Sequence, residues 1–271
     1  MSILTDSYSL NTGAQIPKIG FGTWQIPDGD DAYNSVLTAL KHGYRHIDTA
    51  LVYGNEESVG RAIKDSGIER GELFITTKLP AQIKNPADVQ ANFDRSMTLL
   101  DLEYVNLYLI HAPWPWTEQG TDYTKENILV WKEMEKIYKS GRAKAIGVSN
   151  FNVKDLQAIL DTGEIVPAVN QIRFFIGNTQ EEVTVFCQEH AILVEAYSPL
   201  ATGRLLENET LIAMAEKYSK TVAQLSIRYT LQRGTLPLPK STHEEYIIQN
   251  AEVDFEISDA DMDVLDTLSM S

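Results

Sequence analysis

The sequence predicts an α/β fold in which all 271 residues form one (β/α)8 barrel. Short apolar runs alternate with longer amphipathic ones along the whole chain, and eight of the short runs have the length of a strand. No segment rich in Pro, Gly or Ser divides the chain. Because two parallel strands need a crossover of a dozen or more residues, strands separated by helices imply a parallel sheet, and eight such units close a barrel.

The elements follow in order from these patterns. Residues 8–18 predict a β-hairpin, because a polar turn containing glycine lies between two short runs. The eight strand candidates are residues 18–22, 44–48, 73–78, 104–111, 143–148, 168–171, 192–197 and 235–239. The first helix begins at Asp30, and Asn85 and Pro86 occupy cap and first-turn positions of a later one. A last helix begins near Ser258, so we predict a TIM barrel with an N-terminal hairpin and a C-terminal extra helix.

Composition and charge exclude several classes of protein. The 38 acidic residues outnumber the 23 Lys and Arg residues and give a net charge of −15, which disfavours nucleic acids and anionic membranes as partners. The one cysteine, Cys187, permits no internal disulfide and no cysteine-based metal cluster. No apolar run approaches the ~20 residues of a membrane helix, and no secretion signal is recognisable. We therefore expect a cytoplasmic monomer that acts on a small molecule and holds no metal.

Four side chains near the ends of the strand candidates have a common chemistry: Asp48, Tyr53, Lys78 and His111. In a closed barrel the carboxyl ends of the strands meet at one mouth, so these groups become neighbours. A lysine ammonium ~4 Å from a phenol, at an effective dielectric of ~20, favours the phenolate by ~4 kcal/mol and would lower the pKa of Tyr53. We therefore expect Tyr53 to act as a general acid, Lys78 and Asp48 to tune it, and His111 to hydrogen-bond a carbonyl.

Other interpretations of these residues compete with this one. Singly, a strand-end lysine, acid or tyrosine is more often structural, and His111 beside Pro113 can cap a rigid loop. One His and one Asp without a Cys make a poor zinc site, and no Gly-x-Ser-x-Gly pattern supports a serine hydrolase. Two alternatives stay open: a cofactor-binding regulatory barrel without physiological turnover, and a Schiff-base lyase that uses Lys78.

The second half of the chain contains residues suited to a nicotinamide cofactor. They are Ser149, Asn150, Gln171, Tyr197, Lys240, Ser241 and Thr242. The first four carry groups that can hydrogen-bond a carboxamide or stack on its ring, and the last three precede an expected helix N-terminus, where phosphate is favoured. The Gly20-x-Gly22 pattern is not a dinucleotide fingerprint, because Gln25 replaces the third glycine. We expect these two glycines to allow close packing at a barrel strand.

Motifs along nearly the whole chain resemble those of the aldo-keto reductases. They are Gly20-Phe-Gly-Thr-Trp24, His46-Ile-Asp-Thr-Ala50 with Tyr53-Gly-Asn-Glu56, Phe74-Ile-Thr-Thr-Lys78, Asp101-Leu102 with Leu107-Tyr-Leu-Ile-His111, Gly147-Val-Ser-Asn-Phe151, Asn170-Gln171, Tyr197-Ser-Pro-Leu200 and Pro239-Lys-Ser241. The resemblance is to the bacterial branch that includes 2,5-diketo-D-gluconate reductase. It implies a TIM barrel that reduces an aldehyde or ketone by hydride transfer from NADPH, with Tyr53 as the acid.

The resemblance also implies positions for both ligands. The cofactor positions are Thr23, Ser149, Asn150, Gln171, Tyr197, Ser198, Leu200, Gly203, Lys240, Ser241, Thr242, Tyr246 and Asn250. The substrate positions are Trp24, Tyr53, His111 and Trp114.

The chain departs from the family pattern at three places. Ala112 stands where many relatives have Trp, which changes the wall of the carbonyl pocket. Arg173-Phe174-Phe175 replaces an acid followed by an aromatic-His pair. Tyr246 replaces an arginine that grips the adenosine phosphate, and without that guanidinium the recognition of phosphate is weaker. Use of NADH beside NADPH is therefore possible.

Overall fold

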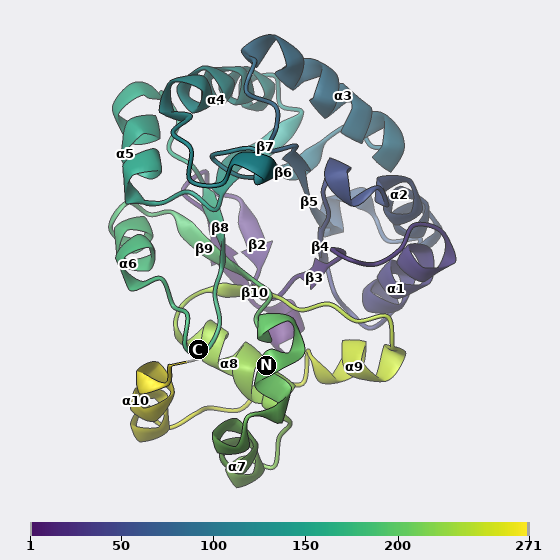
Figure 1. The fold of residues 1–271 in the computed structure, drawn as a ribbon. Helices are drawn as coiled ribbons and strands as arrows, with labels where there is room; N and C mark the ends of the chain where they lie inside the picture. The colour runs from purple at the N-terminus through teal and green to yellow at the C-terminus, as the bar shows by residue number, and fades with distance from the viewer. Residues whose placement is uncertain (1, 270–271) are drawn as a thin grey trace.

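The computed structural model describes residues 2–269 and has an eight-stranded parallel sheet surrounded by helices (Figure 1). The strands are β3 (Phe21–Gly22), β4 (His46–Asp48), β5 (Phe74–Leu79), β6 (Val105–Ile110), β7 (Ala143–Ser149), β8 (Val169–Arg173), β9 (Leu193–Tyr197) and β10 (Leu236–Leu238). Backbone hydrogen bonds from Gly20 N to Pro237 O (3.1 Å) and from Gly22 N to Pro239 O (3.0 Å) join the two ends of the sheet. The predicted barrel is confirmed.

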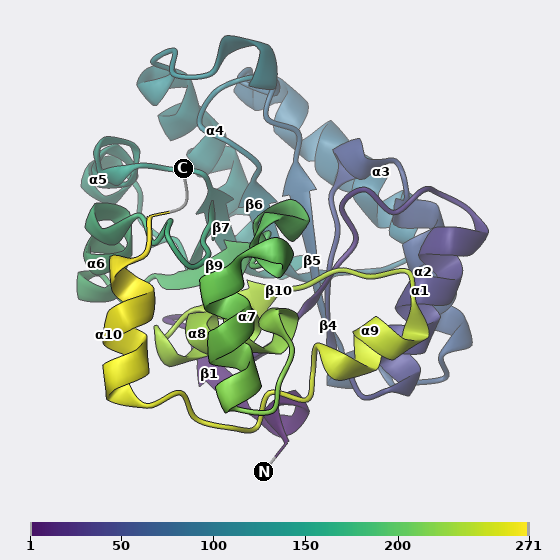
Figure 2. The same ribbon diagram turned by 60° about the horizontal axis from the view of Figure 1, so that its bottom comes forward.

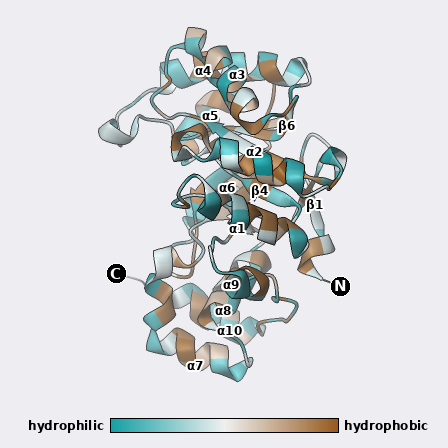
Figure 3. Cartoon of the chain, turned by 90° about the vertical axis from the view of Figure 1, so that its right-hand side faces the viewer, coloured by the Kyte–Doolittle hydropathy of each residue, from teal (hydrophilic) through white to brown (hydrophobic). Residues whose placement is uncertain are grey.

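The helices form a ring outside the strands. They are α1 (Asp30–Lys41), α2 (Glu56–Asp65), α3 (Val89–Leu100), α4 (Thr124–Lys139), α5 (Val153–Thr162), α6 (Glu181–Glu189), α7 (Glu209–Lys217), α8 (Val222–Gln232), α9 (Glu244–Gln249) and α10 (Asp259–Thr267). Brown and teal residues alternate along many of them (Figure 3), as amphipathic helices require. Figure 2 shows α7 to α10 together on one side of the barrel. The predicted extra helix is α10, and the Ser258 side chain caps it by accepting a hydrogen bond from Asp261 N.

The interior of the barrel changes from apolar to polar along the strands. The predicted hairpin, β1 (Ser7–Ser9) paired antiparallel with β2 (Gln15–Pro17), lies beneath the barrel, and Leu10 and Ile16 pack there against inward-facing residues such as Leu107 and Leu236. Toward the carboxyl ends of the strands the inward positions become polar. The buried polar side chains include His46 at the start of β4, Thr76 and Glu195 in the middle of β5 and β9, and Asp48, Lys78 and Gln171 nearer the carboxyl ends. The fold therefore collects ionisable groups at one end of the barrel and closes the other with hydrocarbon.

The first and last strands are shorter than their apolar runs. Lys18 N donates to Asp6 O in the hairpin, so the first run begins outside the barrel and only residues 21–22 pair as a strand. In the last run, Pro237 and Pro239 have no N–H group to donate. A Cβ added at Gly20 would lie 2.5 Å from Leu238 Cδ2. This contact confirms that the glycine is there for close packing.

A glycine contact between α2 and α3 leads to a prediction about stability. A Cβ added at Gly60 would lie 2.3 Å from the carbonyl oxygen of Leu100, and a backbone atom cannot easily move away. We expect Gly60→Ala to lower the free energy of unfolding by about 1–3 kcal/mol, although alanine is the better helix former. The control is Gly71→Ala, because a Cβ there would meet no atom within 4 Å. Urea denaturation measures both variants, and equal midpoints would contradict the packing argument.

Candidate active site

A cavity of about 1070 Å³ opens at the carboxyl ends of the strands. Predicted site residues that line it are Trp24, Asp48, Tyr53, His111, Ser149, Asn150, Gln171, Tyr197, Ser198, Leu200, Gly203 and Lys240. These come from seven of the eight strand units, all except that of β5, so barrel closure brings together residues that are far apart in the sequence. The lining also includes residues that the sequence did not suggest: Gln25, Val52, Pro199 and Thr202.

The remaining predicted residues lie outside the lining. Lys78 and Thr23 are fully buried beneath it, and Thr23 Oγ1 donates to Asp48 O at 3.0 Å. Trp114 stands behind Trp116, with ring centroids 5.2 Å apart, and Trp116 faces the cavity instead. The residues that follow Lys240 continue away from the lining: Ser241, Thr242, Tyr246 and Asn250.

Lys78 links the acid and the phenol. Its Nζ donates to both carboxylate oxygens of Asp48, at 2.7 and 2.8 Å, to Thr49 O at 2.8 Å, and to Tyr53 Oη at 3.4 Å. Burial is the largest single effect and opposes the charge of Lys78, but Asp48, Tyr53 and Glu195 together outweigh it and raise the pKa of the ammonium above its usual value. Lys78 is therefore held as a cation, which removes the free amine that a Schiff-base lyase would need.

Tyr53 and His111 meet at the floor of the cavity. Tyr53 Oη lies 3.5 Å from His111 Nε2, and the two rings meet edge to face with centroids 5.5 Å apart. Burial, followed by the charge of Lys78, holds the pKa of His111 well below its usual value, so the imidazole is neutral. Its Nδ1 has no hydrogen-bond partner among residues 2–269.

The expected lowering of the pKa of Tyr53 is wrong. Burial raises the pKa of this phenol to about 12, and the opposing effect of Lys78 is smaller, with the charge of Asp48 adding to the rise. The loss of water around the hydroxyl opposes the cation, and its size depends on the folded surroundings of Tyr53. Tyr53 therefore keeps its proton at neutral pH, and Lys78 stabilises the phenolate only once the proton leaves.

A buried network beneath Asp48 was not predicted. Gln171 Nε2 donates to Asp48 Oδ2 at 2.9 Å and to Glu195 Oε2 at 2.8 Å, so only its Oε1 remains for a ligand. Burial and then the charge of Asp48 raise the pKa of Glu195 to about 8. The sequence signal was an acid inside an apolar strand run, two residues before Tyr197 and hence on the same inward face.

Asn55 joins two loops and does not cap a helix. It occupies the N-cap position of α2, but its side chain makes no cap hydrogen bond. Its Nδ2 instead donates to Thr23 O and Ile26 O, both at 3.0 Å, and its Oδ1 accepts from Thr49 Oγ1 at 3.0 Å. This buried amide ties the loops after β3 and β4 together, and so fixes the segment that carries Tyr53.

The residues expected to bind a nicotinamide form a connected group. Tyr197 Oη donates to Asn150 Oδ1 at 2.8 Å, and Asn150 Nδ2 donates to Ser149 Oγ at 3.0 Å and to His111 O at 3.2 Å. Asn150 and Ser198 follow β7 and β9 directly and have φ values of 61° and 51°. Residues other than glycine adopt this left-handed region infrequently, asparagine more readily than most.

The expected phosphate position has an acidic neighbour. The predicted helix after Lys240 is present as α9, but it has only 6 residues and carries Glu244 and Glu245 in its first turn. Glu244 pairs with His42, Nε2 to Oε1, at 2.7 Å. Because carboxylates at a helix N-terminus compete with a phosphate for the same N–H groups, this end is a weaker anion site than the sequence suggested.

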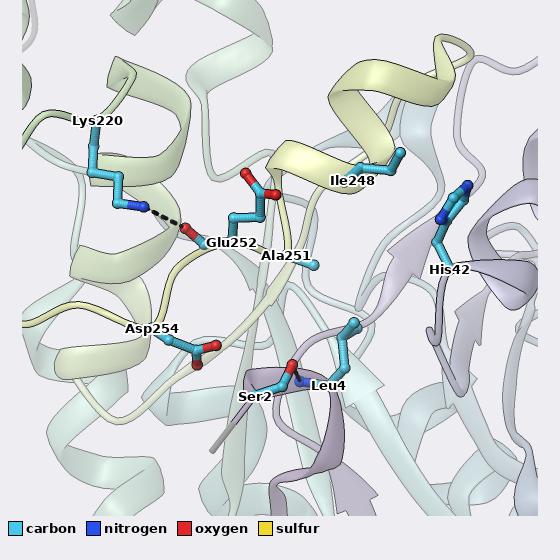
Figure 4. A pocket seen from close by; sticks show the side chains of 8 residues that line it. All are labelled: Ser2, Leu4, His42, Lys220, Ile248, Ala251, Glu252 and Asp254. Atoms are coloured by element: carbon cyan, nitrogen blue, oxygen red, sulfur yellow. Dashed lines mark hydrogen bonds between the residues drawn. The ribbon is translucent and has the colours of Figure 1, made fainter.

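Outside this cavity, the described part of the chain has a further hollow and no metal-binding cluster. A second hollow of about 270 Å³ lies between the N-terminal segment and α9 (Figure 4), away from the strand ends. Two of its charged side chains bond backbone atoms: Lys220 Nζ donates to Glu252 O at 3.3 Å, and Asp254 Oδ1 accepts from Ile3 N at 2.8 Å. Within residues 2–269, no helix is long and apolar enough to cross a membrane, and no three His, Cys, Asp or Glu residues are grouped to hold a metal ion.

Comparison with known proteins identifies the family. The model of the aldo/keto reductase family matches residues 18–269. A glyoxal reductase of Bacillus subtilis (strain 168) is 45% identical over 267 residues, 98% of this chain and 94% of the relative. A glycerol 2-dehydrogenase (NADP(+)) of Saccharomyces cerevisiae is 40% identical over 288 residues, 98% of this chain and 91% of the relative. An aldo/keto reductase from Brucella melitensis has a crystal structure with a TM-score of 0.89 and 40% identity, covering 96% of this chain and 98% of its own. This chain therefore belongs to the aldo/keto reductase family of oxidoreductases.

Proposed function

We propose that this protein reduces aldehydes or ketones to alcohols with NADPH, and that Tyr53 is the general acid. One observation carries the proposal: the Tyr53 hydroxyl, at the floor of a large cavity, lies 3.4 Å from Lys78 Nζ and 3.5 Å from His111 Nε2. A carbonyl oxygen placed against this hydroxyl would face one proton donor and one neutral imidazole. The substrate is a small carbonyl compound, and the relative named glyoxal reductase supports that class.

The protonation states define the mechanism. When bound, the cofactor supplies a hydride to the carbonyl carbon. As the hydride arrives, the carbonyl oxygen gains alkoxide character and becomes more basic than a phenolate, so Tyr53 gives up its proton in the same step even though its pKa is about 12. The resulting phenolate lies beside the Lys78 ammonium, which Asp48 keeps charged and oriented. His111 is neutral, so it orients the carbonyl by hydrogen bonding and does not compete as the acid.

The cofactor fits the remaining lining. Ser149, Asn150 and Gln171 would hold the carboxamide, with Oε1 as the free atom of Gln171. Tyr197 would lie beneath the nicotinamide ring. The segment after β9 would contact the pyrophosphate through Ser198, Leu200 and Gly203. The adenosine phosphate would lie near Lys240 and the residues that follow it, Ser241, Thr242, Tyr246 and Asn250. Trp24 would face the substrate, and Thr23, buried beneath the lining, would support the cofactor from below. The yeast relative, named as an NADP(+) enzyme, supports this choice of cofactor.

The test of the function is NADPH oxidation with a panel of aldehydes and ketones that includes glyoxal. We expect one alcohol formed for each NADPH consumed with at least one member of the panel. Tight NADPH binding without consumption on any carbonyl would instead favour the regulatory barrel. The assembled contacts of Asp48, Lys78, Tyr53 and His111 argue for turnover.

We further propose that the enzyme is a cytoplasmic monomer. Analytical ultracentrifugation would test its oligomeric state, and cell fractionation its location.

Cofactor preference leads to a separate prediction. The exposed Lys240 lines the cavity, while Tyr246 carries no charge and the α9 first turn is acidic. We expect the enzyme to prefer NADPH over NADH because the Lys240 ammonium binds the additional phosphate of NADPH. Lys240→Gln should then lower kcat/KM for NADPH by about tenfold and change kcat/KM for NADH by no more than about twofold. Steady-state kinetics with both cofactors measures the two ratios. An equal loss with both would show that Lys240 does not select the phosphate.

A further inference from the structure

Arg173 is a cationic residue in the cavity that the proposed mechanism does not use. It ends β8, two residues after Gln171, and its Cα pairs with that of Tyr197 on β9. Alternate residues of a strand face the same side, and Val169 and Gln171 both face the barrel interior. Arg173 therefore projects from the inner face of the sheet, and it lines the cavity together with Gln171 and Tyr197.

Within the described residues 2–269, the guanidinium has no anionic partner. Among residues 2–269, no hydrogen bond or ion pair of its side chain is found, and its one ring contact is with Phe175, whose centroid lies 5.3 Å from Cζ. A half-buried arginine presents five N–H donors in a planar fork, and stacking on an aromatic face uses none of them. Its hydrogen-bonding edge is therefore available to a ligand in the cavity.

The backbone around Arg173 is fixed in place. Its carbonyl oxygen accepts from Asn178 Nδ2 and from Gln180 Nε2, both at 2.7 Å. Phe175 and Asn178 form two backbone hydrogen bonds with each other, so the chain after β8 makes a tight turn. Phe175 is only 3% exposed, and its ring, held in this turn, packs against the guanidinium. The cation is thus positioned before any ligand arrives, which lowers the entropy cost of binding.

The charge of the cavity differs from that of the chain. The chain carries −15, but Asp48 is the one carboxylate in the cavity lining and it is committed to Lys78. Arg173 and Lys240 are the other charged groups of that lining. An unpaired guanidinium in such a cavity attracts oxyanions, which it can bind through two parallel hydrogen bonds.

We propose that Arg173 binds an oxyanion of a ligand in this cavity and thereby sets specificity. Carboxylate and phosphate oxygens share this chemistry, so the oxyanion is either a carboxylate of the carbonyl substrate or a phosphate of the dinucleotide. The proposal rests on the proposed function, because it takes a carbonyl compound and a nicotinamide dinucleotide as the ligands. It adds Arg173 to the residues that bind a ligand. If the oxyanion belongs to the substrate, it also adds a substrate class, namely carbonyl compounds that carry a carboxylate.

The experiment compares Arg173→Gln and Arg173→Lys with the wild-type enzyme. Arg61→Gln on α2 is the matched control, because Arg61 is exposed on the outer ring and its loss changes the net charge equally. The substrates are 4-carboxybenzaldehyde and the neutral methyl 4-formylbenzoate. The kcat/KM ratio for this pair and the calorimetric Kd values for NADPH and for each aldehyde are measured for every variant.

Either of two results supports the proposal. In the first, Arg173→Gln lowers kcat/KM for 4-carboxybenzaldehyde by about tenfold or more and changes kcat/KM for the methyl ester by no more than about twofold. Arg173→Lys then recovers part of the loss. In the second, Arg173→Gln weakens NADPH binding by about tenfold with the substrate ratio unchanged, which assigns the oxyanion to the cofactor. Unchanged ratios and unchanged Kd values, or changes equal to those of Arg61→Gln, would overturn it.

The calorimetric measurement separates this proposal from the proposed function. If no aldehyde is reduced but binding of NADPH or of 4-carboxybenzaldehyde still depends on Arg173, the function fails and the oxyanion site stands. If both aldehydes are reduced and no binding constant depends on Arg173, the function stands and the oxyanion site fails.

Discussion

Tyr53→Phe is expected to lower kcat by about 10²–10⁴-fold, the range that a positioned general acid contributes. The Kd for NADPH should stay within about twofold, because the lost hydroxyl faces the carbonyl and not the cofactor. Burial raises the pKa of Tyr53 to about 12, so the phenol is fully protonated at neutral pH and its removal takes away the donor itself. Lys78 cannot replace it, because its ammonium is held by Asp48 and Thr49 O.

The matched control for this variant is Tyr33→Phe. Tyr33 also has a hydrogen-bonded hydroxyl, which donates to Asp65 Oδ2 at 2.9 Å, but it lies on the surface of the molecule. It should keep wild-type kcat. Steady-state kinetics and fluorescence titration with NADPH measure both variants, and full turnover by Tyr53→Phe would remove Tyr53 from the mechanism.

Lys78→Met is expected to damage both stability and turnover. The side chain of Lys78 is fully buried, and its loss leaves the carboxylate of Asp48 without a counter-charge in the barrel interior. Removing one partner of a buried ion pair costs about 3–5 kcal/mol in the free energy of unfolding. Turnover should fall as well, because the phenolate of Tyr53 would form without an ammonium beside it.

The double variant Asp48→Asn/Lys78→Met separates the two effects. It removes both charges, so we expect it to regain much of the stability while kcat stays low. The control is Lys64→Met, which breaks an exposed pair with Asp101 that solvent already screens, and its urea midpoint should be nearly unchanged. If the single and double variants unfold at the same urea concentration, Asp48 and Lys78 are not coupled as the structure indicates.

Local patterns in the sequence were enough to predict the barrel. Each of the eight apolar runs overlaps a strand, and the turn at Gly13 and the cap at Ser258 mark the hairpin and the last helix. The four residues of the proposed mechanism were predicted for the same reason, since each follows or ends a strand and barrel topology places strand ends together. Strand lengths were less predictable, because they depend on which backbone groups pair. The carbonyl of Asp6, for example, accepts the hydrogen bond from Lys18 N and keeps that residue out of the barrel.

The environment of each group could not be predicted from the sequence. The direction of the pKa shift of Tyr53 depends on how much protein covers its hydroxyl, which no local pattern contains. The hydrogen bonds of Gln171 to Asp48 and Glu195 join three strands, and Asn55 bonds loops that are 29 and 32 residues away. Arg173 was visible as a departure from the family pattern, but only the fold shows that no carboxylate of residues 2–269 pairs with it.

The central claim is that Tyr53 gives its proton to the carbonyl oxygen as hydride arrives. Stopped-flow measurement of the first turnover of bound NADPH, in H2O and in D2O, tests it in the wild type and in Tyr53→Phe. The claim predicts that the wild-type hydride step is slower in D2O, and that the variant shows a much slower step without this solvent effect. Equal hydride-transfer rates in the two proteins, with the same solvent effect, would contradict it.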